Sequence, residues 1–224
     1  VQTADELDWL SESRQGHDDL VWMKREVVRA QRTRRAVVAT TPFSFFERGI
    51  KDFGYEEWLI RIMTDAHVTR AYLDRLYEHY VSFSDTYAGS WRGTTDVVLV
   101  TDDLGTQTSL LLPPRVYREL IFPVHQRLVS HIKSILPGVK VLLHSCGAVR
   151  ELIPDFINAG FDALNPVQLS ATGMDPLELK REFGREIAFW GGGINTQETL
   201  IKGGPEEVRD EALRMIDTFA PGGG

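Results

Sequence analysis

The sequence predicts an α/β fold in which strands and helices alternate along the chain. Short apolar runs at residues 36–40, 96–101, 140–143, 162–165 and 187–190 are each followed by a helical pattern. This alternation is typical of parallel β/α units. Polar or glycine residues follow every run, and a (β/α)8 barrel carries its active site at that end of its strands. We therefore expect a (β/α)8 TIM barrel.

An open doubly wound sheet is the competing architecture. No Gly-x-Gly-x-x-Gly follows any expected strand, so the dinucleotide-binding form of that sheet loses its best support. Five strands are fewer than eight, the chain does not begin with methionine, and it ends in a loop-like Ala-Pro-Gly-Gly-Gly. We expect one partial barrel domain over residues 1–224, lacking N-terminal and C-terminal parts. Open sheet edges associate readily, so we expect the isolated chain to be poorly stable or to aggregate.

The elements are expected in the following order. About 1–35 is a lead-in with a helical pattern at 17–35, and residues 36–224 form successive β/α units. Residues 43–48 read as a loop. Helices are expected at 55–64, about 65–83, about 114–136, 151–159, 176–183 and 205–219. Pro123 lies inside one of these helices and predicts a kink, while Gly160 is a favourable residue to end a helix.

Composition narrows the classes of partner. The net charge of −7 argues against nucleic acid and anionic membranes, which attract clustered positive charge. The basic residues between 25 and 35 have acidic neighbours and read as a solvated helix face. A single cysteine excludes an intrachain disulfide framework and fits a reducing compartment. With no secretion signal or membrane-length apolar run visible, we expect a cytoplasmic protein.

His144 and Cys146 follow the third strand and are the strongest candidates for metal ligands. Alternation along a strand points them to the same side. An imidazole and a thiol suit zinc, which needs three or four ligands. Glu47, after the first strand, is the best local carboxylate for a further ligand. The competing interpretations are a buried histidine beside a buried thiol, and an ion pair between Glu47 and Arg48.

Two further groups of polar residues follow other strands. Asp102 and Asp103 are candidate catalytic residues, and alternation points only one of them into the active-site mouth. The alternative is that one caps a turn and the other is solvated. The neutral amides are candidate substrate-binding residues, or they satisfy loop backbone; they are Gln107, Asn165, Gln168 and Asn195.

Four of these segments resemble the uroporphyrinogen decarboxylase superfamily. They are Asp102-Asp103-Leu104-Gly105-Thr106-Gln107, His144-Ser145-Cys146-Gly147, Ala163-Leu164-Asn165-Pro166-Val167-Gln168 and Phe189-Trp190-Gly191-Gly192. The similarity runs from about residue 37 to 224. It implies a (β/α)8 barrel, of which this chain is the later two-thirds. The His-x-Cys is similar to the zinc motif of the superfamily's methyltransferase branch, although the late second cysteine of that branch is absent up to Gly224.

The resemblance implies one preferred function and leaves two alternatives. The preferred function is a Zn²⁺-dependent methyltransferase that moves a methyl group between a corrinoid protein and a thiol or folate acceptor. Asp102 or Asp103, with Asn165 and Gln168, would orient the acceptor. The first alternative is cofactor-free decarboxylation of uroporphyrinogen in tetrapyrrole biosynthesis. The second is a non-catalytic barrel that binds a corrinoid or a partner protein.

Overall fold

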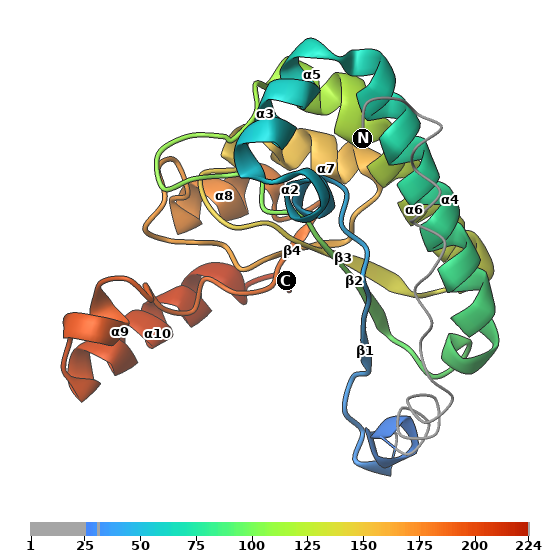
Figure 1. Ribbon diagram of the computed structural model, residues 1–224. Coiled ribbons are helices and arrows are strands. Elements are labelled where there is room, and N and C mark those ends of the chain that lie inside the picture. The colour runs from blue at the N-terminus through green and yellow to red at the C-terminus, as the bar shows by residue number, and fades with distance from the viewer. Residues whose placement is uncertain (1–25, 31, 224) are drawn as a thin grey trace.

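Five short strands form one parallel sheet in the order β1-β2-β3-β4-β5 (Figure 1). The computed structural model describes residues 26–30 and 32–223. The strands are β1 (Val38–Thr40), β2 (Val97–Thr101), β3 (Lys140–His144), β4 (Ala163–Asn165) and β5 (Ala188–Phe189). Each strand pairs in parallel with the next one in sequence. The order never reverses, so the sheet lacks the switch point of a doubly wound fold.

Helices connect the strands. They are α2 (Phe46–Phe53), α3 (Tyr55–Thr64), α4 (Ala66–Trp91), α5 (Pro114–Val116), α6 (Phe122–Ile135), α7 (Ile153–Ala159), α8 (Pro176–Phe183), α9 (Thr199–Lys202) and α10 (Pro205–Phe219). In Figure 1, α9 and α10 extend away from the body of the molecule. Across residues 26–30 and 32–223, every helix is too short or too polar to cross a lipid bilayer.

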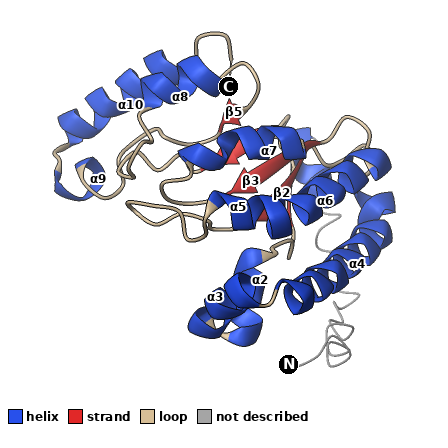
Figure 2. Ribbon diagram, turned by 90° about the horizontal axis from the view of Figure 1, so that it is seen from above, coloured by secondary structure: helices blue, strands red, loops and turns tan. Residues whose placement is uncertain are grey.

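The two faces of the sheet have different neighbours. Val98, Val141 and Leu143 are fully buried in the main core together with apolar residues of the helices. Figure 2 shows α5, α6 and α7 lying across the strands. On the opposite face, Leu142 and Ala163 belong to a separate small apolar cluster. The strand residues therefore pack against apolar neighbours on both faces of the sheet, which explains why the apolar runs do not alternate with polar residues.

The strand register builds rows of side chains on the face away from the main core. Leu142 pairs with Ala163 in one row, and His144 pairs with Thr101 on one side and Asn165 on the other in the next row. Because paired residues of parallel strands point the same way, this second row carries polar groups at the carboxyl edge of the sheet. The sheet thus places the predicted functional residues at one edge.

Helix α2 corrects the expected loop at residues 43–48. Its N-cap residue, Phe45, supplies no side-chain cap. The backbone N–H groups of Phe45, Phe46 and Glu47 instead donate to the Asp102 carboxylate at 2.9, 2.7 and 3.0 Å. A carboxylate at a helix N-terminus is favourable for both hydrogen bonding and the helix dipole. The capping group comes from a distant part of the chain, so the local sequence does not predict this helix.

Other boundaries also differ from expectation. The kink expected at Pro123 is a π-helical segment, Tyr117–Ile121, between α5 and α6. Pro123 has no N–H for the preceding turn, which accounts for the interruption. Helix α4 continues to Trp91, beyond the expected end near 83, and α9 was not expected. Of the helical pattern at 17–35, residues 26–30 and 32 are helical, and residues before 26 and residue 31 lie outside the described ranges.

Two loops cross closely just beyond β2 and β3. The backbone N–H of Ala148 donates to the carbonyl of Thr106 at 2.8 Å. Gly147 has φ of +89°, and a Cβ there would lie 2.4 Å from the carbonyl carbon of Gly105. A side chain at Gly147 therefore cannot be accommodated without separating the loops, which hold Asp103 and Cys146 together.

We predict that Gly147→Ala lowers the free energy of unfolding by about 2 kcal/mol more than Gly138→Ala does. Gly138 is a matched control because its φ is +88° and a Cβ there would have nothing within 4 Å. Both variants incur the left-handed strain, and only Gly147→Ala adds the clash. Urea titration of both variants measures the difference. Equal losses in the two variants would contradict the close-crossing interpretation.

Candidate metal centre

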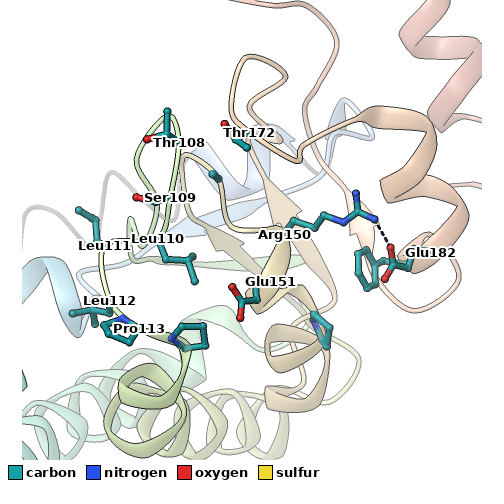
Figure 3. Close-up of a pocket in the computed structure, with 14 residues that line it drawn as sticks. Thr108, Ser109, Leu110, Leu111, Leu112, Pro113, Arg150, Glu151, Thr172 and Glu182 are labelled. Carbon is teal, nitrogen blue, oxygen red and sulfur yellow. Dashed lines mark hydrogen bonds and ion pairs between the residues drawn. The ribbon is translucent and has the colours of Figure 1, made fainter.

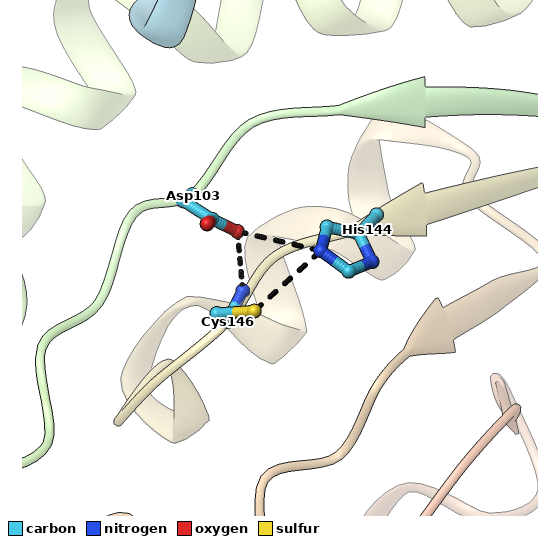
Figure 4. A group of neighbouring side chains, drawn as sticks. All are labelled: Asp103, His144 and Cys146. Carbon is cyan, nitrogen blue, oxygen red and sulfur yellow. Dashed lines mark hydrogen bonds and ion pairs between the residues drawn. The ribbon is translucent and has the colours of Figure 1, made fainter.

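Three side chains with metal-binding atoms converge at the carboxyl edge of the sheet. Asp103 follows β2, His144 ends β3, and Cys146 lies in the loop after β3 (Figure 4). Their candidate ligand atoms all lie within 4.8 Å of one another. The Cys146 Sγ is 3.5 Å from the His144 Nε2, which is 3.7 Å from the Asp103 Oδ1. All three residues are half-buried, so the group is reachable from solvent.

Hydrogen bonding fixes the orientation of the His144 ring. The Asn165 Nδ2 donates to the carbonyl of Trp190 at 2.7 Å, which turns the Asn165 Oδ1 toward His144. The His144 Nδ1 lies 2.5 Å from that oxygen. Because an amide oxygen only accepts, Nδ1 carries a proton, and in the neutral form of the ring Nε2 directs its lone pair toward Cys146 and Asp103. Metal-binding histidines are oriented in the same way by an acceptor on their other nitrogen.

The two adjacent aspartates have different surroundings. Asp102 is fully buried, and besides capping α2 it accepts from the Ser44 hydroxyl at 3.0 Å and contacts the His125 Nε2 at 2.8 Å. Asp103 is half-buried and accepts the Cys146 backbone N–H at 2.7 Å. Alternation therefore separates them as the sequence predicted. Asp102 joins the end of β2 to α2 and α6, and of the two aspartates only Asp103 belongs to the clustered group. A catalytic role for either aspartate stays a prediction.

Negative charge surrounds this group. Burial, followed by the charges of Asp102 and Asp103, raises the pKa of Glu47. Glu47 is half-buried at the start of α2 and lies 3.5 Å from the Ser44 hydroxyl. It lies near the group without being one of the three clustered ligands. Its role as a ligand, predicted from the sequence, stays a prediction.

The Cys146 thiol is hard to ionise in this environment. Burial, the charge of Asp103, a hydrogen bond with Asp103 and the charge of Glu47 together raise the pKa of Cys146 to about 11. A free thiol there is therefore protonated at neutral pH and is a poor nucleophile by itself. A bound cation would reverse these electrostatics, because thiolate and carboxylate ligands would then be paired with positive charge.

The side-chain amides of the four predicted substrate-binding residues all form hydrogen bonds within the protein. Asn165 holds His144, as described above. The Gln168 Oε1 accepts the Gly147 backbone N–H at 2.9 Å, and Gln107 accepts from the Ser170 hydroxyl at 3.2 Å. Asn195 accepts two backbone N–H groups just before α9 and is not one of the three clustered residues. Gln168 alone of the four lines the cavity beside Cys146. A substrate contact by any of them stays a prediction.

Two cavities lie near the carboxyl edge. One of about 490 Å³ includes Cys146 in its wall, together with the loops after β4 and β5. The other, of about 810 Å³, is lined by the Thr108–Pro114 loop, Arg150, Glu151 and part of α8 (Figure 3). Arg150 there forms ion pairs with Glu178 and Glu182. None of the three clustered residues lines the larger cavity, so the smaller one is the cavity that adjoins this group.

Sequence reasoning missed three residues that support the site. His125 lies on α6, its Nδ1 is 3.1 Å from the Tyr117 hydroxyl, and its Nε2 contacts Asp102. Thr101 gives a side-chain hydrogen bond to Glu47. Thr101 is the one with a sequence signal, because it ends a strand beside the aspartates. His125 and Tyr117 lie in a long helical pattern that resembles ordinary core.

The sequence comparison decides the family. The family profile described as Uroporphyrinogen decarboxylase (URO-D) matches residues 21–224. The chain belongs to this family. The resemblance noted in the sequence motifs is therefore confirmed, including its closeness to methyltransferases, which are the curated proteins that the chain matches.

Two of these relatives in the uroporphyrinogen decarboxylase family are described as Methylcobamide:CoM methyltransferase MtaA. The protein of Methanosarcina barkeri is 26% identical over 185 residues, which cover 81% of this chain and 47% of the relative. That of M. barkeri strain Fusaro is 23% identical over 133 residues, covering 58% and 36%. This chain thus spans less than half the length of either relative.

A solved methyltransferase from Methanosarcina mazei has a similar fold. Its TM-score to this chain is 0.57 at 16% identity, over 83% of this chain and 59% of that one. At this identity the likeness establishes the fold. It agrees with the parallel α/β sheet described above.

We predict that Asp102→Asn destabilises the fold much more than Asp103→Asn does. Asp102→Asn should lower the free energy of unfolding by about 3 kcal/mol, because a buried carboxylate with several donors loses an acceptor oxygen. Asp103→Asn should change it by less than about 1 kcal/mol, because the half-exposed amide still accepts from Cys146. Urea unfolding checks both values. Similar losses in the two variants would contradict the assigned roles.

We also predict an unusual pH dependence for the alkylation of Cys146 in metal-free protein. Because the pKa is raised to about 11, the rate with iodoacetamide should rise about tenfold per pH unit up to pH 10. In urea the thiol should regain its ordinary pKa, and the rate should level off near pH 9. Asp103→Asn should shift the folded profile to lower pH, because a negative neighbour is removed. A folded profile that matches the unfolded one would refute this description.

Proposed function

We propose that the chain belongs to a zinc-dependent methyltransferase that moves a methyl group between a corrinoid protein and a thiol or folate acceptor. One observation carries the proposal: the Asp103 carboxylate, the His144 imidazole and the Cys146 thiol place their ligand atoms within 4.8 Å of one another. The names of the matched relatives, which specify a methylcobamide donor and a CoM acceptor, support the methyl-transfer chemistry.

The donor set suits zinc. Imidazole nitrogen, thiolate sulfur and carboxylate oxygen are the three ligand types that zinc takes in proteins, and catalytic sites use three of them with one position open. The Asn165 contact supplies the acceptor that orients His144 for metal binding. Glu47 is a second candidate carboxylate close by. The residues present therefore suit a zinc ion, with His144, Cys146 and Asp103 as the proposed ligands.

We further propose that the sheet is part of a (β/α)8 barrel. The sequential strand order, the rows of inward side chains and the helices gathered against one face all support this. The described residues themselves form an open five-stranded sheet. The site then lies at the carboxyl-terminal mouth of the barrel, where enzymes with this fold place their chemistry.

The residues of this chain would divide the work as follows. Asn165 keeps the proton of His144 on Nδ1, so that Nε2 remains a ligand. Asp103 holds the Cys146 backbone and adds an anionic oxygen, and the thiol of Cys146 must lose its proton to bind. When bound, zinc supplies Lewis acidity that lowers the pKa of an acceptor thiol. The cavity beside Cys146 positions the acceptor, and the mouth remains open toward a methyl donor.

The first alternative from the sequence, decarboxylation of uroporphyrinogen, needs cationic groups to bind a polycarboxylated tetrapyrrole. The described site instead presents the carboxylates of Asp103 and Glu47, which repel such a substrate. Release of CO₂ from uroporphyrinogen would establish that alternative. The second alternative, a non-catalytic corrinoid-binding or partner-binding barrel, predicts no methyl transfer to any thiol.

We predict that the purified protein binds about one zinc ion per chain and that His144→Ala and Cys146→Ala each weaken zinc binding at least tenfold, because each removes one of few ligands. His131→Ala is the control, since His131 lies on α6 and pairs with Asp85. Competition with a chromophoric chelator measures affinity, and methyl transfer from methylcobalamin to a thiol measures activity. Metal-free protein with full activity, or unchanged affinity in both variants, would contradict the proposal.

A further inference from the structure

The cavity of about 490 Å³ beside Cys146 has an apolar and uncharged lining. Its aliphatic wall consists of Pro166, Val167, Leu169, Ile194 and Leu200. The polar side chains there, Gln168, Ser170 and Thr196, are all neutral. Apart from the Cys146 thiol, the described residues that line this cavity include no ionisable group.

Part of the cavity wall is glycine backbone without side chains. Gly191 and Gly192 lie against the loop after β4, since a Cβ at Gly191 would lie 1.9 Å from the Pro166 carbonyl oxygen. Gly193 has nothing within 4 Å of a Cβ position and also lines the cavity. The glycine segment thus forms a wall of backbone, and the aliphatic side chains remain to contact a ligand.

Charges next to the cavity are negative. Asp103 lies 3.7 Å from His144, which contacts Cys146, and Glu47 is on the same side of the sheet edge. Lys202, on the short helix α9 that carries Leu200, pairs with Glu198 at 2.5 Å and does not line the cavity. An anionic ligand body would therefore lose its hydration without gaining a counter-ion from the cavity lining, since a bound zinc ion would already be paired with the charges of Asp103 and the Cys146 thiolate.

We propose that the methyl acceptor of this site is a thiol with an uncharged, mainly apolar body, and that the lining residues around Leu200 select against anionic acceptors. The inference rests on the proposed function and adds the substrate class. It differs from the matched relatives, whose name gives CoM as the acceptor. Gln168 and Ser170 remain as neutral partners for a hydroxyl or carbonyl group of the acceptor.

The test compares two thiols of nearly the same shape. They are coenzyme M, which carries a sulfonate, and its neutral analogue 2-(methylsulfonyl)ethanethiol. Calorimetry with the purified zinc-loaded protein should give a dissociation constant at least tenfold lower for the neutral thiol. Methyl transfer from methylcobalamin should follow the same order. A dissociation constant for coenzyme M equal to or below that of the neutral thiol would overturn the inference.

A second measurement introduces a positive charge at the cavity and follows the preference for the neutral thiol. Leu200→Lys changes a side chain that is 53% exposed, so folding should be retained, and it should reduce the preference for the neutral thiol at least fivefold. Leu213→Lys is the matched control, because Leu213 is 45% exposed on α10 and does not line the cavity. An equal effect of both substitutions would overturn the assignment to this cavity.

The outcomes separate this inference from the proposed function. If the protein transfers methyl groups to coenzyme M in preference to the neutral thiol, the function stands and the inferred acceptor class is wrong. If neither thiol binds and neither accepts a methyl group, the proposed thiol methyltransferase function itself is wrong, and the acceptor class falls with it.

Discussion

The site depends on the hydrogen bonds that the buried carboxylate of Asp102 makes. This carboxylate accepts three backbone N–H groups at the start of α2 and the Ser44 hydroxyl, and it contacts His125 on α6. One side chain thus joins β2 to two helices from different parts of the chain. Because neighbouring residues of an extended segment point apart, fixing Asp102 in the core directs Asp103 toward Cys146. The same network places Glu47 at the first turn of α2, close to the metal-binding group.

The electrostatics of this group favour a bound cation. Two carboxylates and a thiol with a raised pKa lie around the His144 imidazole, and the other nitrogen of that ring is held by Asn165. Such an arrangement is unfavourable for a thiolate alone and favourable for a thiolate that binds a metal ion. We propose that the apolar cavity beside it limits which molecules would reach a bound metal. On this proposal, metal binding and acceptor choice depend on different neighbouring residues.

Much of this organisation could be predicted from the sequence because it depends on local patterns. The five strands, α3, the end of α7 at Gly160 and the approach of His144 to Cys146 follow from apolar runs, glycine positions and alternation. Helix α2 could not be predicted, because its cap comes from Asp102, more than fifty residues later in the chain. Asn165 was expected to contact substrate, and only the register of β3 and β4 reveals its contact with His144. Long-range contacts of this kind leave no local signal.

The central claim is that Asp103, His144 and Cys146 form a metal centre, and the coordination of zinc in the purified protein tests it most directly. Zinc K-edge X-ray absorption should give a first shell with one sulfur at about 2.3 Å and nitrogen or oxygen ligands at about 2.0–2.2 Å. On this account Asp103 would supply one of these oxygen ligands, and Cys146, the sole cysteine, would supply the sulfur. The account therefore predicts that the sulfur contribution disappears in Cys146→Ser. A zinc shell of nitrogen and oxygen alone in the unmodified protein would contradict the account.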